Sequence, residues 1–259
     1  MTEVYGFSQP QLLLFVLVLI RMSAFIVSWP VFGVETISAH IKVLFALTLA
    51  MMVFPTLKFD SEQIIAVNDH MMMMAAKEAA IGLFMGGLAR FFFFAFQIAG
   101  ELVSTSVGLS SAQMFNPTLG GQVSSIEQFY LAFATLFYLS VNGHHFLLTG
   151  LVESFRLVPL SAELLKTGEL KNVSLFVSQV IAIGLQFSAP ILVSILVMNL
   201  VMGVIGKTVP QMNVLMTSFP VNILIGFAVL ILTLPLMIDE MGDFLTIATS
   251  SVFKMVKTF

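Results

Sequence analysis

Cysteine is absent from the 259 residues, which excludes disulfide bonds, thiolate metal sites and cysteine nucleophiles. Charge is also scarce, since Asp, Glu, Lys and Arg make up 10% of the chain, against roughly 25% in a soluble globular domain. Lysine and arginine number 11 against 14 acidic residues and form no long basic run, so the electrostatic surface that nucleic-acid binding requires is missing. We therefore expect no nucleic-acid partner and place the chain, which is 58% hydrophobic, in a membrane or a membrane complex.

The chain contains six long apolar segments. Roughly 20 apolar residues cross the hydrocarbon core of a bilayer, and the lack of regular apolar and polar alternation favours helices over a membrane barrel. The segments are Leu12–Trp29, Ile41–Leu57, Ala79–Ala99, Phe129–Leu151, Leu175–Gly206 and Val214–Ile238. We predict an all-α membrane protein of about six hydrophobic helical units. Because no linker or repeat divides the chain, we expect a single domain over residues 1–259.

Proline predicts that these helical units are kinked. Leu175–Gly206 holds about 32 residues, and a straight helix of that length would measure on the order of 48 Å against a hydrocarbon core of about 30 Å. Pro190 lies near the middle of the segment and removes one helical hydrogen bond, so we expect a kink there. Other prolines lie at or inside the ends of the segments: Pro30, Pro55, Pro117, Pro159, Pro210, Pro220 and Pro235. The sequence therefore predicts interrupted helical packing instead of a bundle of straight spans.

A polar stripe crosses the third apolar segment. At helical spacing Arg90, Gln97 and Glu101 lie within about 40° of one face. An arginine at the centre of a membrane helix costs roughly 2.5 to 3.5 kcal/mol, so Arg90 should face protein or water. Gly82 and Gly86 form a strip of small residues beside it, which predicts a close contact with another helix. The alternative is a conduction or proton-relay role for Arg90 and Glu101.

Motifs for catalysis or cofactor binding are missing. The sequence has no phosphate-binding loop, no dinucleotide fingerprint and no HExxH zinc motif, so we expect neither enzymatic activity nor a cofactor. The adjacent His144 and His145 have no further ligands at metal-binding spacing, which favours hydrogen-bonded imidazoles over a metal site. Met71–Met74 could bind copper through thioethers, but no regular Met-x-x-Met series follows, so we interpret these residues as filling packing gaps.

The stretch SVGLSSAQMFNPTLGGQVSS, Ser106–Ser125, separates two strongly apolar segments without a single charged residue. Its glycines, Gly108, Gly120 and Gly121, allow the backbone to rearrange. Met114 and Phe115 are its largest apolar side chains. One interpretation is an ordinary solvent-exposed turn. The composition alone does not explain why every charge is absent.

Several pieces of the sequence, taken in order, resemble the FliR family of type III secretion export-gate subunits. The pieces are AGELVSTSVGLS (Ala99–Ser110), Asn116–Pro117, NGHH (Asn142–His145) and VPQMNV with FPVNILIG (Val209–Gly226). Residues that fit the family pattern are Arg21, Pro30, Lys42, Pro55, Asn142, Gly143, His144, Pro210, Gln211 and Asn213. Asn116 departs from it, because the family commonly has an aspartate before the proline. The resemblance covers most of the chain.

The resemblance implies a bacterial inner-membrane protein of the flagellar basal body. In that family FliR joins FliP and FliQ in a helical assembly of kinked hairpins raised out of the bilayer plane, next to FlhB and other export-apparatus proteins. Unfolded flagellar proteins are the cargo of this conduit.

The uncharged loop, residues 106–122, resembles the plug that closes the family's pore. The residues concerned are Gly108, Met114, Phe115, Asn116, Pro117, Gly120 and Gly121. A plug that moves aside for many unrelated chains is expected to lack fixed charge, because a charge would bind some cargo and repel other cargo.

Three alternatives stay open. Broken helices, an intramembrane arginine and a glycine-rich loop also suit a small-molecule transporter or channel. The homologous export-gate subunit of a virulence secretion system shares the family's features. An assembly factor without a pore is the third alternative.

Overall fold

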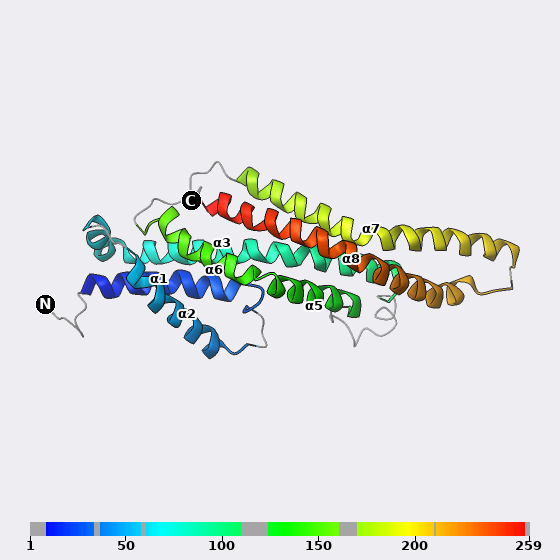
Figure 1. Cartoon of the computed structure of the whole chain (residues 1–259), viewed down its shortest axis with the longest axis horizontal. Helices are drawn as coiled ribbons and strands as arrows, with labels where there is room; N and C mark the ends of the chain where they lie inside the picture. Colours follow the sequence, from blue (N-terminus) through cyan, green and yellow to red (C-terminus); the bar gives the residue numbers. More distant parts are fainter. Residues whose placement is uncertain are drawn as a thin grey trace. The chain divides into compact units, whose positions relative to one another are not determined.

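The computed structural model describes residues 9–33, 37–57, 61–109, 124–160, 170–209 and 211–256 (Figure 1). Every regular element in these ranges is helical, without a strand. The elements are α1 Gln9–Ser28, α2 Ala39–Val53, the short 3-10 helix η1 Phe54–Thr56, α3 Ser61–Val107, α5 Ser125–Ser140, α6 Gly143–Leu157, α7 Leu170–Thr208 and α8 Val214–Val256.

The prediction of an all-α membrane protein is confirmed. By length and composition, five helices of the described ranges are able to cross a membrane, and six units result if the bent pair α5 and α6 counts as one span. Three of the candidate spans are much longer than a bilayer requires: Met71–Val107 with 37 residues, Val173–Thr208 with 36 and Met216–Ser251 with 36.

Three of the expected segments differ clearly from the helices. The segment Val214–Ile238 is extended, since α8 continues to Val256. The third apolar segment was expected at Ala79–Ala99, but α3 has 47 residues and begins at Ser61. Its polar first turns contain neither glycine nor proline before Gly82, so nothing in the sequence stops the helix there. The segment Phe129–Leu151 is divided between α5 and α6 by a break at Val141 and Asn142. Asn142 adopts φ 57°, a left-handed conformation that asparagine tolerates better than most residues.

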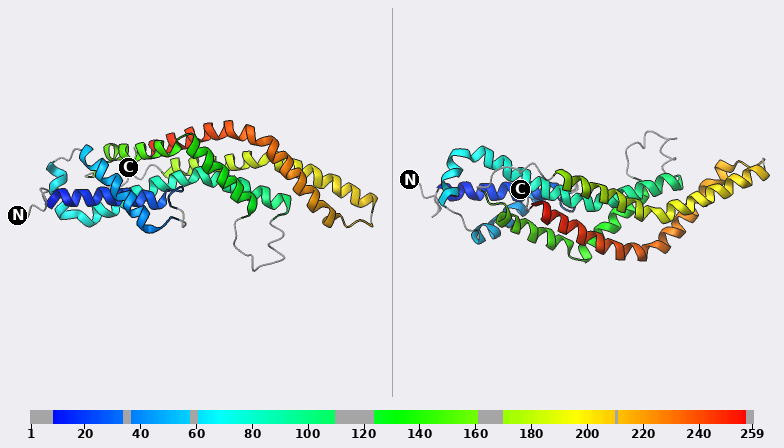
Figure 2. Two further views of the ribbon diagram at one scale, coloured as in Figure 1. Left: turned by 60° about the horizontal axis from the view of Figure 1, so that its bottom comes forward. Right: turned by 90° about the horizontal axis from the view of Figure 1, so that it is seen from above.

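The helix α7 does not end at Pro190, which lies inside it. Proline lacks an N–H, so only the carbonyl group of Gln186 loses its helical donor, and the remaining ladder can continue. Figures 1 and 2 show α7 changing direction near its middle. Pro220 and Pro235 likewise lie inside α8, which Figure 2 shows as bent.

The chain separates into two units, each assembled from several chain segments. The first unit comprises residues 1–91, 142–175 and 247–259, and the second comprises residues 92–141 and 176–246. Trp29 is fully buried in the first unit and lies against Phe25 and Phe32, with ring centroids 5.4 and 4.9 Å away. In the second unit Phe92 stacks on Phe244 at 5.2 Å. The expectation of one domain stays a prediction.

The methionines are only partly core residues. Met74 is 7% exposed and fits the gap-filling interpretation, whereas Met72 and Met73 are 88% and 63% exposed. For these two side chains the interpretation is wrong within this chain.

Candidate functional site

The two glycines of the predicted packing strip lie against α1 in the first unit. A Cβ atom added at Gly82 would clash with the backbone carbonyl of Arg21 and lie 2.8 Å from the Cβ of Ala24. A Cβ at Gly86 would clash with the Ser28 hydroxyl and lie 2.8 Å from the Phe25 carbonyl oxygen. A Cβ at the neighbouring Gly87 would meet nothing within 4 Å. The backbones of α1 and α3 therefore approach closely at Gly82 and Gly86 and not at Gly87.

Arg90 lies one turn beyond Gly86 and binds the end of α1. Its side chain is exposed, and its Nε donates to the Ser28 carbonyl at 2.6 Å while Nη2 donates to the Val27 carbonyl at 3.4 Å. Carbonyl groups in the last turn of a helix have no helical donor, so a cation at this end is stabilising. Gln97 is half-buried and Glu101 is exposed, both in the second unit. A proton-relay role for Arg90 and Glu101 stays a hypothesis.

Arg21 forms the centre of a buried charge cluster in the first unit. The side chains of Arg21 and Glu78 are both fully buried, and Arg21 Nε lies 2.5 Å from Glu78 Oε2. The other guanidinium nitrogens donate to the Ser154 hydroxyl at 3.1 Å and to the Val158 carbonyl at 3.0 Å. The guanidinium carbon lies 4.1 Å from the centre of the Phe155 ring. One arginine thus connects α1, α3 and the end of α6.

Lys77 extends this cluster to the residues that follow α6. Its Nζ donates to the Leu160 carbonyl at 2.6 Å and to the Pro159 carbonyl at 3.2 Å, and it lies 3.9 Å from Glu78 Oε1. Two buried cations therefore share one carboxylate and also bind three carbonyl groups after α6. The arrangement holds the residues that follow α6 against α1 and α3.

Sequence reasoning identified Arg21 only through the family pattern, and it missed Lys77, Glu78 and Ser154. Lys77 and Glu78 directly precede the predicted segment Ala79–Ala99 and were therefore placed outside the membrane helix. Once α3 is known to be continuous, ionisable residues inside a membrane-span candidate are the signal that would have found them.

The NGHH residues lie at the break between α5 and α6. Asn142 precedes α6 with its left-handed backbone, and Gly143 is buried as the first residue of that helix. The His144 and His145 rings meet edge to face with centroids 4.3 Å apart. Among the described residues no three Cys, His, Asp or Glu side chains gather as a metal site would require.

The uncharged loop begins at a well-defined helix end. The Leu109 N–H donates to the Ser104 carbonyl at 3.1 Å, and the Gly108 N–H donates to the Thr105 carbonyl at 3.2 Å. This pair of bonds is the Schellman arrangement, with Gly108 at φ 94° in the position that favours glycine. The remaining loop residues of the plug prediction lie outside the described residues: Met114, Phe115, Asn116, Pro117, Gly120 and Gly121.

The VPQMNV residues form the connection between α7 and α8. Asn213 Oδ1 accepts a hydrogen bond from the Met216 N–H at 3.3 Å, so Asn213 caps the start of α8. Gln211 is exposed, and Pro210 lies outside the described residues. Pro30 follows α1 after one intervening residue, Trp29.

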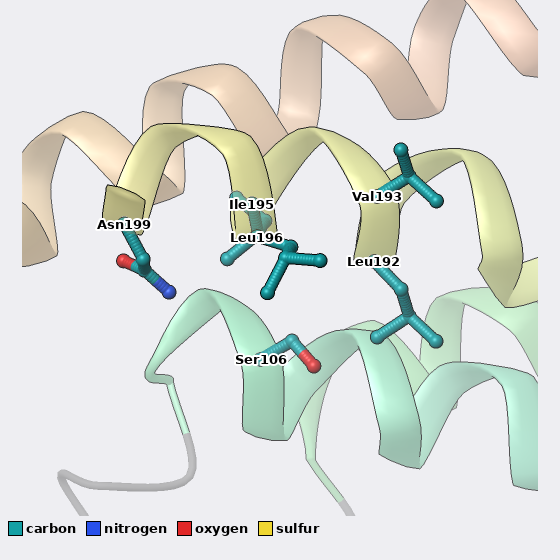
Figure 3. Close-up of a pocket in the computed structure, with 6 residues that line it drawn as sticks. All are labelled: Ser106, Leu192, Val193, Ile195, Leu196 and Asn199. Atoms are coloured by element: carbon teal, nitrogen blue, oxygen red, sulfur yellow. The ribbon is translucent and has the colours of Figure 1, made fainter. Parts of the chain in front are cut away.

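A shallow groove of about 370 Å³ lies between the end of α3 and the middle of α7 in the second unit (Figure 3). Its lining is apolar except for the Ser106 hydroxyl and the Asn199 amide. The lining residues are Ser106, Leu192, Val193, Ile195, Leu196 and Asn199. The lining contains no acidic or basic side chain beside these two polar groups.

Comparison with known proteins gives one consistent result. Residues 12–247 match the model of the family described as bacterial export proteins, family 1. The chain is 36% identical over 221 residues to the flagellar biosynthetic protein FliR of Bacillus subtilis (strain 168), covering 84% of both chains. It is 31% identical to FliR of Aquifex aeolicus (strain VF5), covering 86% of both chains. FliR of Escherichia coli (strain K12) is 24% identical over 84% of this chain and 83% of its own.

Proposed function

The chain belongs to the bacterial export proteins, family 1, and from this membership we propose that it is a membrane-embedded subunit of the flagellar export apparatus. The family is defined by protein export and not by a chemical reaction, which agrees with the lack of catalytic motifs. The similar proteins named above are flagellar, and this favours the flagellar system over a virulence secretion system.

The length of the apolar helices is the main observation that supports an assembly with other proteins. Candidate spans of 36 and 37 residues measure roughly 55 Å at 1.5 Å per residue, whereas the hydrocarbon core is about 30 Å thick. Along α7 and α8 large apolar side chains are exposed over most of this length: Leu185, Val193, Leu196, Val197, Leu200, Val201, Val204, Leu224, Phe227, Ile231, Leu232 and Leu236. Lipid tails cover only part of such a surface, so other proteins have to cover the rest.

In the proposed assembly the chain forms the inner-membrane conduit together with FliP and FliQ. FlhB and further export-apparatus proteins lie beside it, and unfolded flagellar proteins pass through. The support for these partners is family membership together with the unsatisfied apolar surface of α7 and α8.

Within this conduit, the loop at residues 106–122 acts as a pore plug. Its support is the uncharged, glycine-containing sequence, which begins in the last turn of α3. An uncharged plug obstructs the pore without attracting cargo of either charge.

Purification from the membrane tests the assembly. A tagged chain, extracted with mild detergent, should emerge with other small hydrophobic proteins, and deletion of its gene should abolish flagellin secretion while flagellin is still synthesised. Reintroducing the parent gene is the control. Recovery of the chain alone or as a homo-oligomer would favour a small-molecule transporter, and normal flagellin secretion in the deletion strain would contradict the export role.

A further inference from the structure

Three residues of the FPVNILIG motif lie on one face of α8. Phe219, Asn222 and Gly226 are spaced by three and four residues, which places them on the same side of a helix. Each of them has a contact outside α8, and all of these contacts are within the second unit. We call these three residues the docking face.

Phe219 covers the glycine at which α3 ends. A Cβ atom added at Gly108 would lie 2.6 Å from Cδ1 and 2.8 Å from Cε1 of the Phe219 ring. Gly108 also has φ 94°, which an L side chain rarely adopts. Two separate constraints therefore require glycine at this position: the left-handed backbone conformation and the Phe219 ring packed against it.

Gly226 receives the last helical residue of α3. A Cβ atom added at Gly226 would lie 2.6 Å from Cγ2 of Val107 and 3.7 Å from its Cβ. Val107 is 1% exposed, so this side chain is fully enclosed at the contact. Val107 and Gly108, at the end of α3, thus contact Gly226 and Phe219 of α8. These two α8 positions lie about two helical turns apart.

Asn222 lies between these two contacts and ties the same face to α7. Its Nδ2 donates to Oδ1 of Asn199 at 3.0 Å, and Asn222 is 6% exposed. Asn199 in turn lines the groove opposite Ser106 (Figure 3). Among largely apolar helix surfaces this part-buried amide pair restricts which residues of α7 and α8 can face each other.

We propose that the docking face of α8 is the anchor that positions the root of the uncharged loop, with Phe219 and Gly226 as positioning residues and Gly108 as the point of departure. The end of α3 has the Schellman bonds of an ordinary helix end, but these bonds alone do not place it on another helix. The contacts with Phe219 and Gly226 do so, and they fix the position of Val107 and Gly108 on α8. The functional consequence rests on the proposed closure role of this loop.

Disulfide cross-linking tests the anchor independently of that role. The 3.7 Å between the Val107 Cβ and a Cβ at Gly226 suits a disulfide, whose Cβ atoms lie about 3.8 Å apart. The chain has no native cysteine, so the double variant Val107→Cys/Gly226→Cys gives no background. In the purified complex, oxidation should join the two cysteines in a disulfide, so that no free thiol remains. The control is Thr105→Cys/Gly226→Cys, which should keep both thiols because Thr105 is exposed. Free thiols in both variants would overturn the anchor.

A second experiment tests the positioning role. Phe219→Ala removes the ring from Gly108, and Met216→Ala is the control because Met216 lies in the first turn of the same helix and is 70% exposed. Both complexes should assemble, and only the Phe219→Ala complex should leak small ions from loaded vesicles. A tight Phe219→Ala complex in which the cross-link still forms would overturn the positioning role. If a shortened loop is also tight, the closure role fails while the anchor stands.

Discussion

Glu78 is the residue on which the buried charge cluster depends. Its side chain is fully buried, its Oε2 pairs with Arg21, and its Oε1 lies 3.9 Å from Lys77 Nζ. Removing one member of a buried ion pair destabilises a protein more than replacing both members with apolar residues, because the remaining charge stays desolvated. Ser154 and the carbonyl groups after α6 solvate the cations but carry no compensating negative charge.

We expect Glu78→Gln to destabilise the protein by about 3 to 5 kcal/mol, the usual cost of leaving a buried charge without its partner. The measurement is the temperature at which the purified complex loses its subunits. Glu153→Gln is the control, since its contact with Arg156 at 3.4 Å joins side chains that are 43% and 73% exposed. Such an exposed pair contributes about 0 to 1 kcal/mol. Equal thermal behaviour of the two variants would contradict a stabilising role of the cluster.

At the scale of elements, the contact between α1 and α3 depends on glycine residues, which have no side chain to separate the two backbones. Membrane helices gain little from apolar association in lipid, so close backbone approach and hydrogen bonds replace it. Here Gly82 and Gly86 have no side chain, so the α1 backbone approaches α3 closely. Arg90 binds the carbonyl groups at the end of α1. The neighbouring Gly87 has open space and takes no part in the contact.

Replacing both Gly82 and Gly86 with leucine should separate α1 from α3, because each new side chain would occupy the position of α1 backbone atoms. Overpacking of this kind costs typically 1 to 3 kcal/mol or more per site. We expect less assembled complex and less flagellin in the medium. The control is Gly87→Leu, which should assemble like the parent. If the double variant also assembles and exports normally, the glycine strip is incidental.

At the scale of the whole molecule, the loop at residues 106–122 divides two long apolar helical regions and adds no charge to either. Because Gly108 and Leu109 complete the end of α3, a deletion confined to residues 110–122 leaves that helix end intact. Such a deletion therefore tests the proposed obstruction separately from the packing that holds the helices.

Shortening residues 110–122 should leave assembly largely unchanged and make the closed complex leak. Met114→Ser with Phe115→Ser should leak less, since the backbone obstruction remains while the apolar contact is lost. Ion conductance or solute uptake in vesicles that contain the purified complex measures both effects. The parent complex is the control, and a shortened loop that assembles and stays as tight as the parent would refute the plug and favour a plain turn.

Much of the fold follows from local sequence pattern. The apolar segments predict the helices, and Asn213 and Gly108, at the start of α8 and the end of α3, are of residue types that favour helix ends. The apolar pattern does not predict the helix boundaries at two places. The break at Asn142 lies inside the expected segment Phe129–Leu151, and the first turns of α3 are polar yet helical. Length and hydropathy do not register such boundaries, because a helix ends where its backbone finds other partners.

By itself the amino-acid sequence determined the membrane class, the helical composition, the family and the uncharged character of the loop. These properties depend on local hydropathy and on residue order. Only the tertiary structure decided that Arg21 pairs with Glu78, 57 residues away, and that Gly108 lies under Phe219. The physical reason is that both contacts join helices distant in the chain. A helix surface rich in leucine, valine and phenylalanine offers many neighbouring arrangements of similar energy, so the partner of a single charge or glycine is settled only when the helices pack.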